Sequence, residues 1–254
     1  MRATLAALAM SLVSVPAAAT SAWIGVLSES AKACEGARIQ RVLVKSPAER
    51  AGLKPDDCVS SVGVRVVRSP RDLRAALDGA ALGDPVNVRF LRAGRATNAL
   101  VMPAARPSEL ELQRSQLIGQ PIPNFDKAEW VSRGGGTKAR ATIVAFGASW
   151  CGPCRMAEPA LMRVHDRFRV QGVHLVHMRE DPRDVASAFA SSEPAGTAVA
   201  SDDRGEIASQ LFVFSLPTFV IVDQQGRVSD IIAGYSADFE ARLSTTLSTI
   251  LRPK

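Results

Sequence analysis

The pentapeptide Trp-Cys-Gly-Pro-Cys at 150–154 constrains this chain of 254 residues more than any other feature. An apolar run at 141–146, typical of a buried strand, precedes it, and a helical pattern follows it. Two intervening residues at a strand-to-helix turn bring both sulfurs within bonding distance. The first thiol then lies at a helix N-terminus, where partial positive charge and free N–H groups favour its thiolate.

The spacing predicts that Cys151 is the exposed nucleophile and that Cys154, one helical turn further, is the resolving thiol. Cys151 attacks a substrate disulfide, a mixed disulfide forms, and Cys154 releases the reduced product. A zinc site is the alternative for such a pair, but no second Cys or His pair lies at ligand spacing. His174 and His177 would point to opposite faces of one strand. We therefore expect no metal and no cofactor besides the redox-active Cys151–Cys154 disulfide.

The C-terminal half of the chain alternates strand and helix patterns. We expect strands at 141–146, 173–178, 218–222 and 228–233, with helices after residue 154, from residue 181 and over 236–251. A late hairpin turns at 223–226. The pattern predicts an α/β fold around a mixed sheet.

Residues 117–254 resemble the thioredoxin superfamily. The resemblance rests on the 150–154 motif, on Pro159 and on Leu216-Pro217-Thr218. It implies that Pro217 is cis and lies against the cysteine pair, and that the backbone at Leu216 pairs with a substrate strand. The substrate would also pass Gly152 and Pro153, and we expect Trp150 to pack beside Cys151 and shield it.

Within that superfamily the chain is similar to the exported TlpA/ResA-type branch, through residues 119–125 and 219–226. Ala145 stands where cytosolic thioredoxins have a buried aspartate, and Ala157 stands where the branch often keeps a glutamate. Glu158 follows, but a shift of one residue turns a helical side chain by about 100°. We therefore expect Glu158 to be solvated and identify no general acid or base.

The first residues have the order of a secretory signal peptide: Met1-Arg2, an apolar stretch at 4–15, Pro16 and three alanines. We predict a cleaved signal peptide at 1–22 and an exported protein. The alternative is an uncleaved N-terminal membrane anchor, although the apolar run is shorter than the roughly 20 residues that span a bilayer.

A second domain is predicted at 23–104, because Pro and Ala at 103–107 replace the preceding strand-like pattern. A linker at 105–114 joins it to the domain at 115–254. Ser-Pro pairs at 46–47 and 69–70 are helix starts. The segment resembles the PDZ domains of bacterial envelope proteases, through Trp-Ile-Gly-Val at 23–26, the run at 46–53 and the Asp-Cys-Val at 57–59. Asp56 departs from the family, which usually has glycine there.

This resemblance implies a small mixed β/α barrel-type domain that binds a C-terminal peptide as an added strand. Ile24, Gly25 and Val26 would form the loop that receives the carboxylate, and Leu73 and Leu77 would line the groove. Core packing is the alternative for these apolar side chains.

The distribution of charge along the chain and the state of the remaining cysteines each allow two interpretations. Residues 20–104 hold 13 Lys or Arg and 8 Asp or Glu, whereas residues 115–254 hold 15 of each. We expect no nucleic-acid partner, because aromatic residues are few and no basic run exists. The positive charge indicates a solvated face or a surface for acidic partners. Cys34 and Cys58 either form a structural disulfide or leave a buried free thiol.

Together these features predict an exported thiol–disulfide oxidoreductase. Its partners would be protein thiols and disulfides, and a membrane or periplasmic electron donor would supply its electrons. The Gly-Pro dipeptide resembles that of reducing family members, which favours a reductase. The alternative is a PDZ-based adaptor whose thioredoxin-like domain senses redox state or is not catalytic. A protease is excluded, because no serine nucleophile motif accompanies the PDZ-like pattern.

Overall fold

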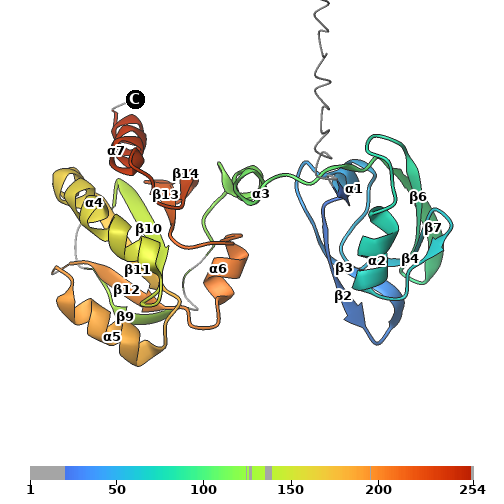
Figure 1. Cartoon of the computed structure of the whole chain (residues 1–254), viewed down its shortest axis with the longest axis horizontal. Helices are drawn as coiled ribbons and strands as arrows, with labels where there is room; N and C mark the ends of the chain where they lie inside the picture. Colours follow the sequence, from blue (N-terminus) through green and yellow to red (C-terminus); the bar gives the residue numbers. More distant parts are fainter. Residues whose placement is uncertain (1–20, 124, 126–127, 135–138, 195, 253–254) are drawn as a thin grey trace, which may run out of the picture. The chain divides into compact units, whose positions relative to one another are not determined.

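The computed structural model describes residues 21–252 except 124, 126–127, 135–138 and 195. The chain divides between Arg106 and Pro107 into two compact units, each with its own sheet and core (Figure 1). The predicted signal peptide falls almost wholly outside the described residues. Within the described part of the chain, no helix is both long enough and apolar enough to cross a membrane.

The first unit is built on an antiparallel sheet with the strand order β2-β3-β4-β6-β7. A short strand, β5 (Arg65–Val66), pairs with β4, and β1 (Ala22–Trp23) pairs with β8 (Ala104–Ala105). The five main strands run over Val26–Ala31, Cys34–Val42, Cys58–Val62, Val86–Arg92 and Arg95–Val101. Strand β2 is an edge of this sheet.

Both helices of this unit begin at the predicted Ser-Pro pairs. They are α1 (Pro47–Arg50) and α2 (Pro70–Leu77). The hydroxyl of Ser46 accepts the N–H of Glu49 at 3.1 Å, and the hydroxyl of Ser69 accepts that of Asp72 at 3.2 Å. These bonds satisfy N–H groups that the first turn of a helix leaves unpaired. The buried face of α2 then joins the core of the sheet.

The left-handed backbone of Asp56 explains why glycine is usual at this position in similar domains. Its φ is +70°, which costs a residue with a side chain more than glycine. The Asp56 N–H donates to the carbonyl of Ile39 at 2.8 Å, and its carboxylate accepts from Arg38 at 2.7 Å. Asp is among the residues that tolerate this conformation best. The departure from the family pattern is therefore accommodated.

A disulfide joins Cys34, at the start of β3, to Cys58, at the start of β4. This outcome decides between the two readings of these cysteines in favour of a structural bridge. The cysteines are 24 residues apart, and closing a loop of that size stabilises a fold by about 3 kcal/mol.

The second unit is built on a six-stranded mixed sheet with the order β14-β13-β10-β11-β12-β9. Strands β10, β11 and β12 are parallel, and the others pair antiparallel. The strands run over Glu129–Ser132 (β9), Ala141–Gly147 (β10), Val173–Arg179 (β11), Ala198–Ser201 (β12), Thr218–Asp223 (β13) and Val228–Ala233 (β14). The expected α/β fold with a mixed sheet is confirmed.

Helices α4 (Gly152–Arg169) and α7 (Phe239–Ile250) pack together on one face of this sheet (Figure 1). The side chains at 173, 175 and 177 of β11, which are every second residue of the strand, point to that face. Helix α5 (Arg183–Ser192) packs against β12 and β9, and a short helix, α6 (Glu206–Gln210), precedes β13.

The predicted linker at 105–114 contains the first turns of a helix, α3 (Glu109–Leu117). Ser108 caps this helix through a capping box, in which Ser108 and Glu111 exchange side-chain and backbone hydrogen bonds. Arg114 of the helix pairs with Asp230 of β14. Residues 107–114 therefore belong to the second unit, whereas Ala105 pairs with β1 in the first unit.

Candidate redox site

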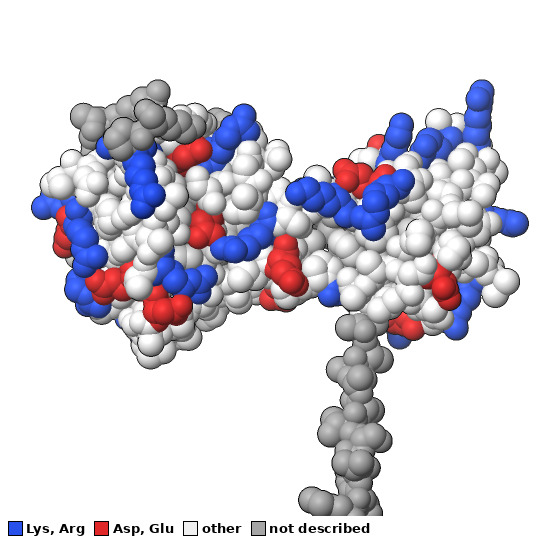
Figure 2. All heavy atoms as spheres, turned by 90° about the horizontal axis from the view of Figure 1, so that it is seen from above, with Lys and Arg blue, Asp and Glu red and all other residues white. Residues whose placement is uncertain are grey.

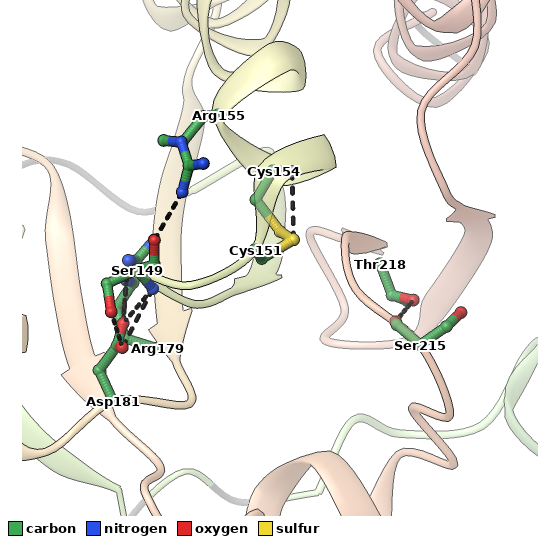
Figure 3. The surroundings of a disulfide bond; sticks show 8 residues. All are labelled: Ser149, Cys151, Cys154, Arg155, Arg179, Asp181, Ser215 and Thr218. Carbon is green, nitrogen blue, oxygen red and sulfur yellow. Dashed lines mark hydrogen bonds and ion pairs between the residues drawn. A yellow bond between two sulfur atoms is a disulfide. The ribbon is translucent and has the colours of Figure 1, made fainter.

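The two cysteines of the motif lie where β10 passes into α4. Cys151 is the N-cap of α4, and its sulfur accepts the backbone N–H of Cys154 at 3.1 Å. A disulfide joins the two residues (Figure 3). The sulfur of Cys151 thus occupies the place where a helix N-terminus stabilises a negative charge.

The expectation that Cys151 is exposed is wrong in this disulfide form. The side chain of Cys151 is buried, with 3% exposure, in a cluster with Ala148 and Cys154 against which Leu216 packs. Trp150 is itself 67% exposed and lines the same groove as Cys151.

The peptide bond between Leu216 and Pro217 is cis, as the resemblance implies. The hydroxyl of Thr218 donates to the carbonyl of Ser215 at 2.7 Å (Figure 3). The carbonyl of Pro217 accepts the N–H of Gly234 at 2.8 Å. These bonds attach the Leu216–Pro217 segment to the first residues of β13 and the end of β14.

A groove of about 510 Å³ opens beside the disulfide. It brings together Trp150, Cys151, Gly152, Pro153 and Leu216, which the sequence singled out. Cys154 is absent from its lining, so only the first cysteine faces the groove. Sequence reasoning missed the other half of the wall: Glu180, Ala208, Val213, Phe214 and Ser215.

The loop before Cys151 is held by a buried carboxylate that the sequence did not reveal. Asp181 accepts the N–H of Ser149 at 2.9 and 3.0 Å and its hydroxyl at 2.6 Å (Figure 3). Arg179 pairs with the same carboxylate at 2.9 and 3.0 Å. The helix expected from residue 181 begins at Arg183 and has no side-chain cap. The side chain of Asp181 turns toward the redox loop.

Arg179 is itself buried and lies close to the disulfide. Its guanidinium stacks over the ring of Phe189 at 4.1 Å. A Cβ added to Gly147 would lie 3.5 Å from both the Arg179 Nη1 and the Cys154 Sγ. The cation and the resolving sulfur therefore flank the same glycine at the end of β10. Arg155 braces the loop from outside by donating to the carbonyl of Ser149 at 2.8 Å.

Glu158 is not solvated, contrary to expectation. It lies four residues after Cys154, so both share one side of α4, and its side chain is 29% exposed. Its carboxylate faces His177 of β11 at 3.6 Å. Burial raises the pKa of Glu158, and the nearby charges of His177 and Arg179 oppose that rise. Ala145 is buried in the core at the position expected from the sequence.

In the first unit, the residues predicted to form a peptide groove mostly serve the core. Ile24, Leu73 and Leu77 are 1%, 3% and 7% exposed. Val26 packs partly against that core. Gly25 has a φ of +82°, and a Cβ there would lie 2.2 Å from the Cβ of Ser46, so only glycine fits. The alternative reading of the leucines as core residues therefore holds for this structure.

On the face of this unit that Figure 2 shows, Lys and Arg side chains lie among Asp and Glu side chains. Arg38 pairs with Glu29 and Asp56, and Arg92 pairs with the buried Asp57 at 2.7 Å. Part of the positive charge is thus neutralised locally.

Comparison with known families agrees with this division of the chain. Residues 22–102 match the model of the PDZ domain, and residues 118–231 match the model of the AhpC/TSA family. The first unit is thus similar to PDZ domains, and the second is similar to the thioredoxin-like AhpC/TSA family.

Among curated proteins, the chain is similar to thiol-disulfide oxidoreductase ResA of Bacillus thuringiensis subsp. konkukian. The two are 29% identical over 98 residues, which are 38% of this chain and 57% of ResA. A DsbE homolog of Paracoccus denitrificans, named a thiol:disulfide interchange protein, is 38% identical over 34% of this chain and 46% of its own length. The chain thus spans about half the length of these relatives.

Solved structures similar to parts of the chain include a thiol:disulfide interchange protein DsbE from Chlorobium tepidum. It is 23% identical, with a TM-score of 0.44, and the match covers 53% of this chain and 98% of that one. The HtrA-type protease AlgW, solved with a decapeptide, is 21% identical with a TM-score of 0.33. That match covers 34% of this chain and 30% of AlgW.

Proposed function

We propose that this chain, in which a PDZ domain precedes a thioredoxin-like domain, is an exported thiol–disulfide oxidoreductase that reduces protein disulfides. One observation carries the proposal. The Cys151–Cys154 disulfide lies at the N-terminus of α4, and its first sulfur faces a groove beside the cis Leu216–Pro217 bond.

In the reduced form, the Cys151 thiolate accepts the N–H of Cys154 and benefits from the positive end of α4. It attacks one sulfur of a substrate disulfide and expels the other as a thiolate, which leaves a mixed disulfide. The Cys154 thiolate then attacks the Cys151 sulfur, expels the second substrate thiolate and closes the Cys151–Cys154 disulfide. Two electrons pass to the substrate, and an external dithiol donor must restore them. No dissociable cofactor takes part.

The groove favours an extended and partly apolar substrate segment. Exposed aromatic side chains of Trp150 and Phe214 line it, and they are 67% and 45% exposed. The backbone at Leu216 lies along the same wall as Gly152 and Pro153. A substrate strand laid there would bring its disulfide to the only cysteine in the lining, Cys151.

Reduction of insulin by dithiothreitol tests this function. The wild-type protein should accelerate precipitation of the insulin B chain, and Cys151→Ser should return the rate to that of dithiothreitol alone. The variant lacks the only sulfur that faces the groove. A wild-type protein without turnover would favour the alternative, a PDZ-based adaptor with a non-catalytic redox domain.

Export is supported by the disulfide between Cys34 and Cys58, which is remote in sequence from the redox motif. Structural disulfides persist in oxidising compartments and are rare in the cytosol. The signal-peptide pattern of residues 1–22 points the same way.

The PDZ domain is proposed to recruit clients or an electron donor. Strand β2 is an edge of its sheet, and α2 packs against it. An edge strand leaves backbone groups available to an added peptide strand. The loop at Gly25 directly precedes β2, as it would if it received the terminal carboxylate of such a peptide.

Deletion of residues 23–101 tests recruitment separately from chemistry. Insulin reduction should be unchanged, because the second unit has its own sheet and core and contains every residue that lines the groove. The set of clients captured by a Cys154→Ser variant should change. An identical client set with and without the PDZ domain would contradict recruitment.

A further inference from the structure

Three side chains with metal-binding atoms converge in the thioredoxin-like domain, away from the groove. Glu158 comes from α4, His177 from β11, and Glu193 from the residue after α5. Their ligand atoms all lie within 4.8 Å of one another. These residues are far apart in the sequence, so spacing alone gave no sign of them and predicted no metal ligands.

The distances suit a shared cation better than direct hydrogen bonds. The His177 Nε2 lies 3.6 Å from the Glu158 Oε1 and 3.4 Å from the Glu193 Oε2. Two ligands on one tetrahedral zinc lie about 3.3 Å apart, because zinc–ligand bonds are about 2.0–2.1 Å long. The two distances from His177 are therefore close to that spacing, and the third pair of ligand atoms lies within 4.8 Å.

None of the three facing atoms has another partner among the described residues. The Glu158 Oε1, the His177 Nε2 and the Glu193 Oε2 are buried and make no hydrogen bond. The side chain of His177 is only 3% exposed, and that of Glu193 only 10%. Buried polar atoms are normally satisfied, so three unsatisfied atoms aimed at one point indicate a missing partner.

The nearest guanidinium does not fill this role. Arg179 is committed to Asp181 at 2.9 Å and to the ring of Phe189. Phe189 also holds the His177 ring in an edge contact at 5.0 Å, which orients the imidazole. The two carboxylates thus share a buried space with the His177 ring, while the guanidinium of Arg179 is held by Asp181.

We propose that Glu158, His177 and Glu193 bind one divalent transition-metal ion of the zinc class. An imidazole ligand disfavours the hard cations Mg²⁺ and Ca²⁺, which prefer all-oxygen sites. Three protein ligands leave a fourth position for water. The ion joins α4 to β11 and to the end of α5, and it stabilises the domain that carries the redox pair.

Zinc titration of the oxidised full-length protein tests the site, because closed disulfides keep the cysteine thiolates from binding zinc. After treatment with a chelator, the wild-type protein should take up about one Zn²⁺ per chain by isothermal titration, and Mg²⁺ should not compete. Glu158→Gln and Glu193→Gln should each weaken zinc binding at least about tenfold, as loss of outer-shell partners already does. Zinc should raise the unfolding midpoint of the wild type and not that of the variants.

Asp203→Asn is the matched control, because Asp203 lines a separate acidic groove with Glu129 and Glu206. It should bind zinc as the wild type does. Co²⁺ in place of zinc should give the visible absorption of a tetrahedral site in the wild type and in Asp203→Asn, but not in the Glu158 and Glu193 variants. Absence of zinc uptake, or equal affinity in a Glu158→Gln/Glu193→Gln double variant, would overturn the proposal. Circular dichroism of the zinc-free variants separates a lost ligand from a lost fold.

Discussion

Cys154→Ser should leave the protein covalently joined to its substrates through Cys151. The first displacement needs only the sulfur that faces the groove, and that sulfur is still present. The second displacement needs the Cys154 thiol, so the mixed disulfide cannot resolve. High-mass adducts should accumulate in the exported fraction, disappear under dithiothreitol and identify the clients by mass spectrometry. Insulin turnover should fall to background.

The control for this prediction is Cys151→Ser, which should trap nothing. Cys154 is adjacent in the same disulfide but does not line the groove. Adducts that formed equally well on Cys154 would mean that substrates approach from another side, and the groove would then not be the substrate site. The identity of the trapped proteins also reports direction, since clients of a reductase carry disulfides that the variant has opened.

Asp181→Ala should be the most destabilising single change near the site. Asp181 is 1% exposed and satisfies the N–H and hydroxyl of Ser149 as well as the guanidinium of Arg179. Its removal leaves the charge of Arg179 buried without a partner, which costs about 3–5 kcal/mol. Denaturant unfolding of the thioredoxin-like domain should show this loss, and insulin reduction should fall because the loop before Cys151 loses its anchor.

Asp184→Ala gives the comparison. Asp184 lies in the exposed first turn of α5, so its loss should change the unfolding free energy by no more than about 0.5 kcal/mol. If Asp181→Ala were equally mild, the contacts between Asp181 and Ser149 would not hold the redox loop. The destabilisation should be smaller in Asp181→Asn, which keeps an acceptor for Ser149 but loses the charge that balances Arg179.

No residue for proton transfer at the site is assigned. Ala145 and Ala157 stand where the resemblance to thioredoxin-like proteins led us to look for acidic side chains. Glu158 is turned toward His177 and Glu193. The sulfur of Cys151 accepts the N–H of Cys154 at the start of α4, and Glu180 is a carboxylate that lines the same groove as Cys151.

The sequence by itself determined the local elements of this protein. Ser46 and Ser69 predicted the starts of their helices, because a capping side chain and the N–H groups that it satisfies lie within one turn of the chain. The Cys-Gly-Pro-Cys sequence likewise predicted its disulfide, because the two cysteines are separated by a single turn. The strands β10, β11, β13 and β14 followed from apolar runs, which depend on neighbouring residues only, whereas β9 and β12 were not predicted.

Tertiary structure alone decided the contacts that act between distant segments. Asp181 could cap a helix or hold Ser149, and only the parallel placement of β10 and β11 brings it to the redox loop. The Cys34–Cys58 pairing and the meeting of Glu158, His177 and Glu193 likewise need three-dimensional packing. A side chain with several possible partners contacts the one that the fold brings within reach, and this partner cannot be predicted from spacing along the sequence.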